Sequence, residues 1–386
     1  MIDKANIIKN YTSDTAGSII DIFYNELVSK EDQKLLELAF AKKITQTQLD
    51  DFLKNWDIEK FGERKSMLLS YVMKTNPQLQ FSTYEKPRLE GLLKYHRFHN
   101  LKLISHYTKM VRALNAENIF PMILKGGAMK HIRPELSRAM GDIDILIPDE
   151  NEFAKAREIC KKLGYEEEIP NGNSIDFHLP NSKEGTVDLH YYIDFETDYD
   201  KSFLKDLFMR AKKEKVLAAQ AFVPCFEDLL FLGMINLARN LNNKTSLQGI
   251  LYSLFDFNFL TQSKPDFNWN LVLQNIIKTN TYAQALLAIK FINKIIPEML
   301  PEALINNNLI KKKFNRYCQK IIFHHFYFND FQKEGKKLSL KNALKGRRKF
   351  KNYLVKKPQY FFLKRIIRKS DFLIGIFLLF KSGKKI

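Results

Sequence analysis

The sequence is poor in cysteine and has no long run of apolar residues. Its 386 residues include 3 cysteines, and Cys160, Cys225 and Cys318 match neither metal-binding spacing nor a disulfide framework. The N-terminal stretch MIDKANIIKNYTSD lacks the apolar segment that a signal peptide needs. The longest apolar run, residues 372–380, is much shorter than the about 20 residues that cross a bilayer as a helix. These absences disfavour a secreted or membrane-spanning class, and we expect a cytoplasmic protein.

Acidic residues are scarce at the C-terminal end. The chain has a formal net charge of +19, and residues 301–386 contain 23 Lys and Arg against 4 Asp and Glu. The whole excess of positive charge therefore belongs to this basic tail. The tail is either a solvated basic face or a binding surface for a polyanion, namely RNA or an anionic membrane. The membrane alternative would make the protein peripheral to a membrane.

Helical periodicity dominates both ends of the chain. Apolar residues repeat at helical spacing in residues 1–80, and a long helix is predicted over 89–115 after a linker at 76–87. From residue 223 onward the pattern is helical again, beginning with the apolar segment FEDLLFLGMINLARNL. Hydrophobic residues make up 45% of the chain, which is enough for a sizeable core.

Between these helical parts the pattern changes to short strands. The stretches NIFPMILKG and GDIDILI each predict a buried strand. Asp149 is placed to cap a helix that ends at Gly164, and the segments SIDFHL and TVDLHYYI predict a hairpin. Strand, helix, strand, helix and hairpin together indicate a compact unit that contains both helices and a small sheet.

Two aspartates interrupt the second of these strands. Asp142 and Asp144 are two residues apart, so they project from one face while the neighbouring isoleucines face the other side. Two carboxylates at this spacing can hold hard cations such as Mg²⁺ or Mn²⁺, which offsets the cost of burying their charge. The stretch TVDLH adds Asp188 and His190 on one face of another strand.

A Gly-Gly pair precedes the two aspartates. Gly126 and Gly127 end the first strand and open the short helix AMKHI, where backbone N–H groups and the helix N-terminus can hold a phosphate. Two-metal phosphoryl transfer needs a set of carboxylates of this kind. The pattern therefore favours a phosphoryl-transfer site.

Together these stretches resemble the nucleotidyltransferase motif of the DNA polymerase β superfamily. LKGGAM, SRAMGDIDILI, LGY and VDLH are similar to one bacterial branch of it, a family of uncharacterised nucleotidyltransferases. The resemblance is closest over residues 120–193 and weaker over 223–296. It implies an α+β fold in which a small mixed sheet of the polymerase β type is flanked by helical regions. The implied parts are an N-terminal helical region at 1–84, a nucleotidyltransferase catalytic domain at 85–222, and a helical C-terminal domain with the basic tail at 223–386.

The resemblance also implies roles for individual residues. The implied metal ligands and catalytic acids are Asp142, Asp144 and Asp188. Asp188 would in addition take the proton from the attacking hydroxyl. The implied nucleotide- and phosphate-binding residues are Lys125, Gly126, Gly127, Arg138 and His190.

The activity that the resemblance implies is Mg²⁺- or Mn²⁺-dependent transfer of a nucleoside monophosphate from an NTP such as ATP. The acceptor would be a hydroxyl of a peptide, protein, sugar or other metabolite, and pyrophosphate would be released. The stretch LKGGA also looks like nucleotidyltransferase toxins of abortive-infection systems, whose RNA acceptor would suit the basic tail. The alternative from another class is a non-catalytic binding protein on a degenerate transferase fold.

Overall fold

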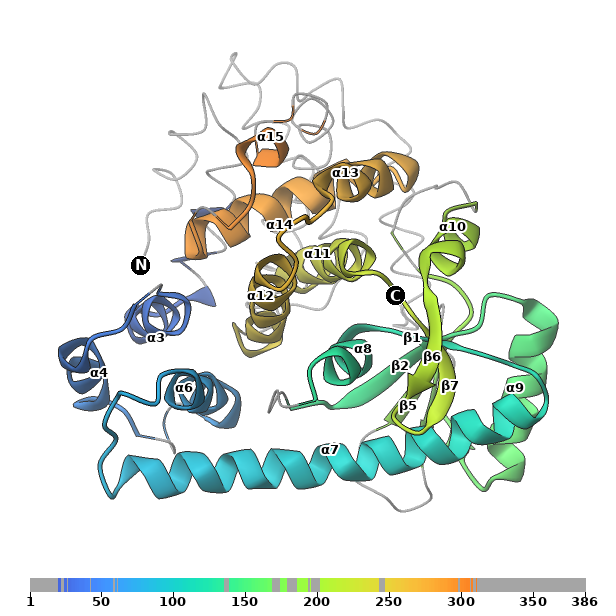
Figure 1. Ribbon diagram of the computed structural model, residues 1–386, viewed down its shortest axis with the longest axis horizontal. Coiled ribbons are helices and arrows are strands. Elements are labelled where there is room, and N and C mark those ends of the chain that lie inside the picture. The colour runs from blue at the N-terminus through green and yellow to red at the C-terminus, as the bar shows by residue number, and fades with distance from the viewer. Residues whose placement is uncertain are drawn as a thin grey trace, which may run out of the picture. The chain divides into compact units, whose positions relative to one another are not determined.

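The computed structural model describes most of residues 20–310, of which 20–307 belong to one compact unit (Figure 1). Gaps in this description fall at 22–23, 26, 42, 58–59, 61, 135–138, 169–173, 179–185, 194, 196–201, 243–246, 298, 306 and 308–309. The predictions for residues 1–19, and nearly all of the basic tail, lie outside the described residues. The division into three domains stays a prediction.

Four described helices precede the sheet: α3 (Lys30–Phe40), α4 (Gln46–Leu53), α6 (Glu63–Thr75) and α7 (Glu85–Ala116). Ser29 and Thr45 cap α3 and α4, each in a reciprocal capping box with the residue three positions on. Helix α7 begins at Glu85, so the prediction that the linker extends to Pro87 was wrong. Pro87 lies in the first helical turn, where its missing N–H would have no partner within the helix.

The sheet has seven strands: β1 (Met122–Ile123), β2 (Asp142–Leu146), β3 (Glu166–Glu167), β4 (Ser174–His178), β5 (Thr186–His190), β6 (Lys212–Val216) and β7 (Ala219–Val223). Their order is β3-β4-β5-β2-β1-β7-β6. Pairs β2–β5 and β1–β7 are parallel, and the other neighbours are antiparallel. This mixed sheet with many helices confirms the predicted α+β class, and β2 lies at its centre.

Strands β6 and β7 had no counterpart in the sequence prediction. They form a hairpin whose two turn residues, Leu217 and Ala218, both have positive φ, +49° and +76°. Turns of this kind match the twist of a hairpin but normally carry Asn or Gly. Because Leu and Ala give no such signal, the hairpin could not be recognised from local sequence.

Two helices flank the central strand. Helix α7 contacts β2, β5 and β7, and α8 (Lys125–Ile132) follows β1 directly and contacts β2. Figure 1 shows α7 running along one side of the unit, with α8 beside the strands. Asp149 caps α9 (Glu150–Lys162) as predicted: its carboxylate accepts hydrogen bonds of 2.9 Å from two backbone N–H groups.

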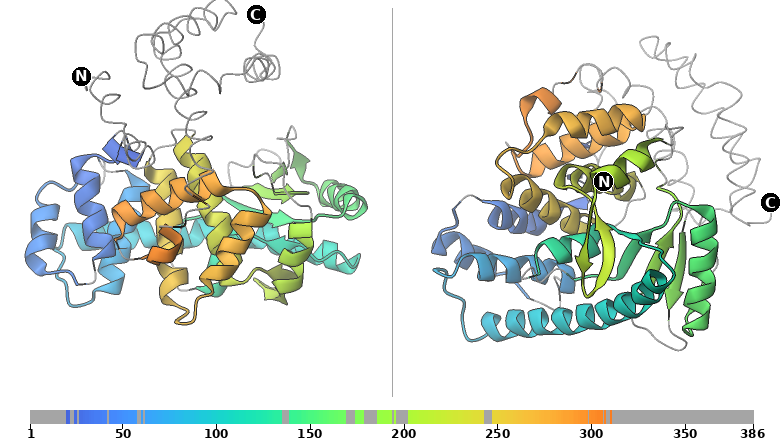
Figure 2. Two further views of the ribbon diagram at one scale, coloured as in Figure 1. Left: turned by 90° about the horizontal axis from the view of Figure 1, so that it is seen from above. Right: turned by 45° about the vertical axis from the view of Figure 1, so that its right-hand side comes forward.

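Six further described helices follow: α10 (Ser202–Arg210), α11 (Phe226–Asn242), α12 (Leu247–Gln262), α13 (Trp269–Lys278), α14 (Tyr282–Ile295) and α15 (Glu302–Ile305). Helix α11 contacts α12, α13, α14 and also α8, so the C-terminal bundle reaches the sheet unit. Figure 2 (right) shows this bundle, yellow to orange, on the far side of the strands from α7. Tyr71 of α6 meets Phe255 of α12 edge to face at 4.5 Å. Among the described helices none is long and apolar enough to cross a membrane.

Helix α8 approaches the sheet closely at Gly127. A Cβ placed on Gly127 would lie 2.8 Å from Cδ1 of Ile123 and 3.1 Å from Cγ2 of Ile143, and both isoleucines are fully buried. Any larger residue would therefore force the Ile123 side chain to shift or α8 to move away from β1 and β2. Packing alone is a sufficient reason for glycine at this position.

We predict that Gly127→Ala lowers the free energy of unfolding by about 1 kcal/mol, because overpacking outweighs the gain in helix propensity. Gly91→Ala is the matched control: Gly91 lies within α7, and an added Cβ there meets nothing within 4 Å. This control should gain up to about 1 kcal/mol. Urea unfolding measures both variants, and equal stabilisation would contradict the close approach at Gly127.

Candidate functional site

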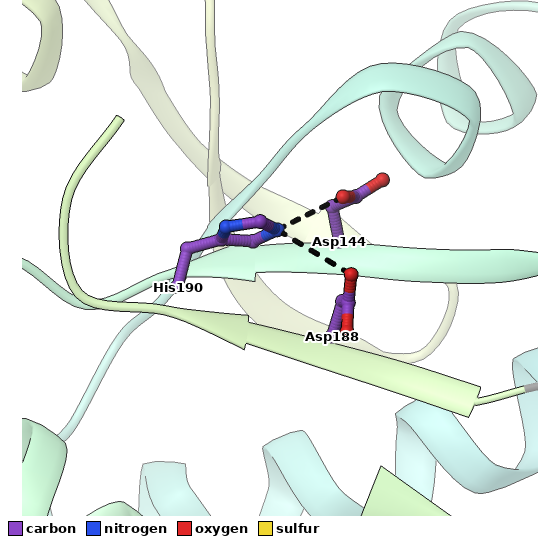
Figure 3. Close-up of side chains that lie close together, drawn as sticks. All are labelled: Asp144, Asp188 and His190. Carbon is purple, nitrogen blue, oxygen red and sulfur yellow. Dashed lines mark hydrogen bonds and ion pairs between the residues drawn. The ribbon is translucent and has the colours of Figure 1, made fainter. Parts of the chain in front are cut away.

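The site is built on the pairing of β2 with β5. In this parallel pair Asp144 lies directly opposite Asp188. His190 follows two residues after Asp188 and so projects from the same face of the sheet. Nε2 of His190 lies 2.9 Å from Oδ1 of Asp144 and 3.8 Å from Oδ2 of Asp188. Figure 3 shows the imidazole facing both carboxylates. Strand pairing thus brings three side chains together from segments more than forty positions apart.

Asp144 is the most deeply buried of the three, with 2% of its side chain exposed. Its Oδ1 accepts a hydrogen bond from His190 and forms an ion pair with the ammonium group of Lys125. Burial raises the pKa of Asp144, but the charge of Lys125 and the hydrogen bond from His190 hold it well below its usual range. Asp144 is therefore ionised, and its negative charge is compensated within the protein.

Asp188 has a different environment. Its side chain is 17% exposed, and Oδ1 is buried with no hydrogen-bond partner among the described residues. Ligand atoms of Asp144, Asp188 and His190 all lie within 4.8 Å of one another. A buried carboxylate oxygen without a donor, beside a second carboxylate and an imidazole, fits a divalent cation. These three residues can hold a metal ion.

Asp142 is the first residue of β2 and is exposed. It shares a strand face with Asp144 by the alternation of side chains, and both residues line a cavity between β2 and the helices α8, α11 and α12. Asp142 is not part of the close group with Asp188 and His190. Its role as a metal ligand stays a prediction.

Lys125 occupies a strained position where β1 passes into α8. Its φ is +44°, in the left-handed region that non-glycine residues seldom adopt. In this conformation Lys125 forms an ion pair with Asp144. Burial lowers the pKa of the Lys125 ammonium, but the negative charge of Asp144 outweighs this effect, so the pKa is raised. Strained backbone conformations of this kind concentrate at functional sites. The predicted role of Lys125 toward phosphate stays a prediction, because its described partner is a carboxylate.

The two glycines differ in their surroundings. Gly126 and Gly127 lie in the first turn of α8, where backbone N–H groups have no partner within the helix. Gly126 lines the cavity beside Asp144, whereas Gly127 faces the isoleucines of β1 and β2. Arg138 lies outside the described residues.

A further carboxylate adjoins the site without having been assigned a role from the sequence. Asp176 of β4 lies opposite Asp188, so three aspartates follow one another across β2, β5 and β4. Burial, and to a lesser extent the nearby charge of Glu168, raises the pKa of Asp176. A signal was present, because SIDFH and TVDLH share the order Asp, apolar, His. Only the antiparallel register shows that their aspartates meet.

A cavity of about 230 Å³ opens beside Asp144. Its lining residues come from four elements, α8, β2, α11 and α12: Lys125, Gly126, Met129, Asp142, Asp144, Leu229, Leu232, Gly233, Asn236, Asn240, Ser253, Asp256, Phe257 and Leu260. The polar residues of α11 and α12 in this lining had no predicted role. Most residues of these two helices are apolar, so the sequence pattern alone predicted that the helices belong to the hydrophobic core.

The model of a family described as uncharacterised nucleotidyltransferase matches residues 66–297, which include the site strands and the helices α11 and α12 that line the cavity. No curated protein and no solved structure matches the chain.

We predict different effects on stability for substitution of Asp144 and of Asp188 when metal is removed with EDTA. Asp144→Asn removes the partner of Lys125 and His190, so the free energy of unfolding should fall by about 1–3 kcal/mol. Asp188→Asn removes a carboxylate that faces another carboxylate, so stability should be unchanged or higher. Urea unfolding compares the two, and equal losses would contradict the described pairing.

The same variants test the metal site. Mn²⁺ should raise the melting temperature of the unaltered protein, since a ligand that binds only the folded state stabilises it. Asp144→Asn should lose most of this rise, and Asp188→Asn should lose part of it, because Asp144 and Asp142 remain on β2. A full rise in either variant would show that the altered residue is not a ligand.

Proposed function

The chain belongs to the family of uncharacterised nucleotidyltransferases, and we propose that it transfers a nucleoside monophosphate from an NTP to a hydroxyl acceptor, releasing pyrophosphate. The observation that carries this proposal is the pairing of Asp144 with Asp188, with His190 beside both. Family membership alone supports a general nucleotidyl transfer. The acceptor class and the requirement for Mg²⁺ or Mn²⁺ belong to the proposal.

Asp188 is the proposed proton acceptor. The oxygen of the acceptor hydroxyl forms a bond to the α-phosphorus, the bond from that phosphorus to the β-phosphate oxygen breaks, and pyrophosphate leaves. The hydroxyl proton passes to a carboxylate oxygen of Asp188. This assignment is supported by the buried Oδ1 of Asp188, which no described donor satisfies and which can therefore accept a proton.

Asp144, Asp188 and His190 are the residues proposed to hold a divalent cation, with Asp142 as a further candidate from the same face of β2. Such a cation, when bound, supplies positive charge at phosphate oxygens and lowers the pKa of an attacking hydroxyl. The low pKa of Asp144 keeps this ligand ionised without a metal. Lys125 and His190 thus keep the Asp144 carboxylate negatively charged where the cation is proposed to bind.

Phosphate binding is proposed at the beginning of α8. Backbone N–H groups of the first turn, at Gly126 and Gly127, can donate to phosphate oxygens, and the helix dipole favours negative charge there. Lys125 adds an ammonium group at the same point. Arg138 remains a predicted phosphate ligand from outside the described residues.

The proposed acceptor is a small molecule, a peptide or a protein, with RNA as the alternative if the basic tail of residues 301–386 recruits a polyanion. A purely structural role is disfavoured by the site itself. The buried Oδ1 of Asp188 has no hydrogen-bond donor among the described residues, which costs folding energy unless a ligand uses it.

The experiment that tests the proposed function is label transfer. The full chain is incubated with each α-labelled NTP, with Mg²⁺ or Mn²⁺, and with fractions of a cell lysate. Label that resists phosphatase should appear in one fraction only. That fraction, which contains RNA, protein or small molecules, identifies the class of acceptor. If no NTP transfers label under any of these conditions, the proposed activity is wrong.

We predict that Asp188→Asn lowers kcat by about hundredfold or more, as loss of a general base does, while NTP affinity changes by less than about tenfold. Asp176→Asn is the matched control, one strand further from Asp144, and should keep kcat within a few-fold of the unaltered protein. Steady-state rates and NTP titration separate the two effects. A large loss of NTP affinity with unchanged kcat would make Asp188 a binding residue instead of the base.

A further inference from the structure

The cavity beside Asp144 contains more polar groups than the proposed phosphate chemistry uses. Asn236 and Asn240 come from α11, and Ser253 and Asp256 come from α12. None of the four belongs to the group formed by Asp144, Asp188 and His190. The cavity therefore has a polar wall that faces the site from the C-terminal helices.

The position of the cavity favours the nucleotide over the acceptor, on the premise of the proposed function. Its lining includes Lys125 and Gly126, which are the proposed contacts of the triphosphate. Asp188, the proposed acceptor of the hydroxyl proton, is not among the lining residues, and neither is His190. A group that extends from the phosphates into this cavity is the base and sugar of the NTP.

The helix faces that form the wall are apolar at one end and polar at the other. Leu229, Leu232 and Gly233 of α11 lead at helical spacing into Asn236 and Asn240. On α12 the order is reversed, since Ser253 and Asp256 come before Phe257 and Leu260. Polarity therefore changes in opposite directions along the sequences of α11 and α12, and the two faces give one slot with apolar walls and a polar end. Such a slot complements a flat heteroaromatic ring, whose edges form hydrogen bonds.

The two helices are held close together at the apolar end. A Cβ on Gly233 would lie 2.7 Å from Cε1 of Phe257, so α11 and α12 cross in direct contact there. The volume of about 230 Å³ is smaller than the 300–1,000 Å³ typical of pockets for larger ligands. A single base with part of its sugar suits this space better than a polymer end or an extended peptide.

We propose that this cavity is the nucleobase subsite and that Asp256 selects guanine. Guanine presents two parallel donors, N1–H and the 2-amino group, to which a carboxylate can bind with both oxygens. Adenine and cytosine place a ring nitrogen acceptor beside their amino group, and uracil flanks its single N–H with two carbonyl oxygens. A carboxylate repels these acceptors, so it discriminates against all three bases. Asn236 and Asn240 supply amide donors for the oxygen and ring nitrogen on the other edge of guanine.

The first test uses the full chain without substitution. Calorimetry measures the binding of GTP, ITP, XTP and ATP, each with Ca²⁺ in place of Mg²⁺ to suppress turnover. GTP should bind about tenfold to hundredfold more tightly than ATP, and ITP, which lacks the 2-amino group, should bind about tenfold more weakly than GTP. Equal affinities, or a preference for ATP, would overturn the assignment even if no variant could be studied.

The second test is Asp256→Asn. An amide accepts from N1–H but donates toward position 2, so it matches the carbonyl group of xanthine instead of the amino group of guanine. The variant should lose about tenfold to hundredfold in GTP affinity and should bind XTP more tightly than GTP. Asp266→Asn is the matched control, because Asp266 is exposed between α12 and α13 and does not line the cavity. It should keep the preference for GTP.

The outcomes separate this inference from the proposed function. If all four nucleotides bind and Asp256→Asn changes none of the affinities, the base-selecting role is wrong while nucleotide binding stands. That result would favour an amine-bearing acceptor as the ligand of Asp256. If no nucleotide binds to the unaltered chain, the proposed function fails and the inference fails with it.

Discussion

The buried carboxylate of Asp144 is the constraint on which the site depends. Only 2% of the Asp144 side chain is exposed, so its negative charge must be compensated by neighbouring groups. Lys125 at the start of α8 and His190 on β5 provide this compensation. The backbone of Asp144 is also engaged, since its carbonyl oxygen accepts a 2.9 Å hydrogen bond from the N–H of Leu124. The junction of β1 with α8 is therefore tied to β2 through both the main chain and the side chain of one residue.

The C-terminal helices take their position from a second buried charge. Asp228 at the start of α11 is fully buried and accepts hydrogen bonds from Arg210 of α10, at 2.8 and 3.0 Å, and from Asn275 of α13, at 2.8 Å. A satisfied network of this kind allows little variation in the placement of its members. Because α11 contacts both α8 and α12, the network also determines where the cavity wall stands relative to Asp144. The sheet and the helical bundle thus share one site.

Local signals in the sequence account for much of the fold. Asp149 caps α9 as its position predicts. The apolar periodicity of α7 predicted a helix over 89–115, and the observed helix is four residues longer at its start and one residue longer at its end. The failures are also local in origin. Leu217 and Ala218 adopt a turn that their side chains do not signal, and Pro87 looked like a helix stop although a first-turn proline is compatible with a helix. Residue propensity predicts what a segment prefers, and tertiary contacts overrode it at the hairpin.

The sequence by itself determined which side chains share a face, because alternation along a strand is a property of the backbone: Asp142 with Asp144, and Asp188 with His190. It also placed two glycines at the start of a helix. Only the tertiary structure decided that Asp188 lies opposite Asp144, that Lys125 compensates the charge of Asp144, and that Gly127 is needed for packing. These facts depend on register and on the approach of distant segments, and no local pattern specifies either. The same holds for the cavity wall, since the polar residues of α11 and α12 come together only where the two helices meet the sheet.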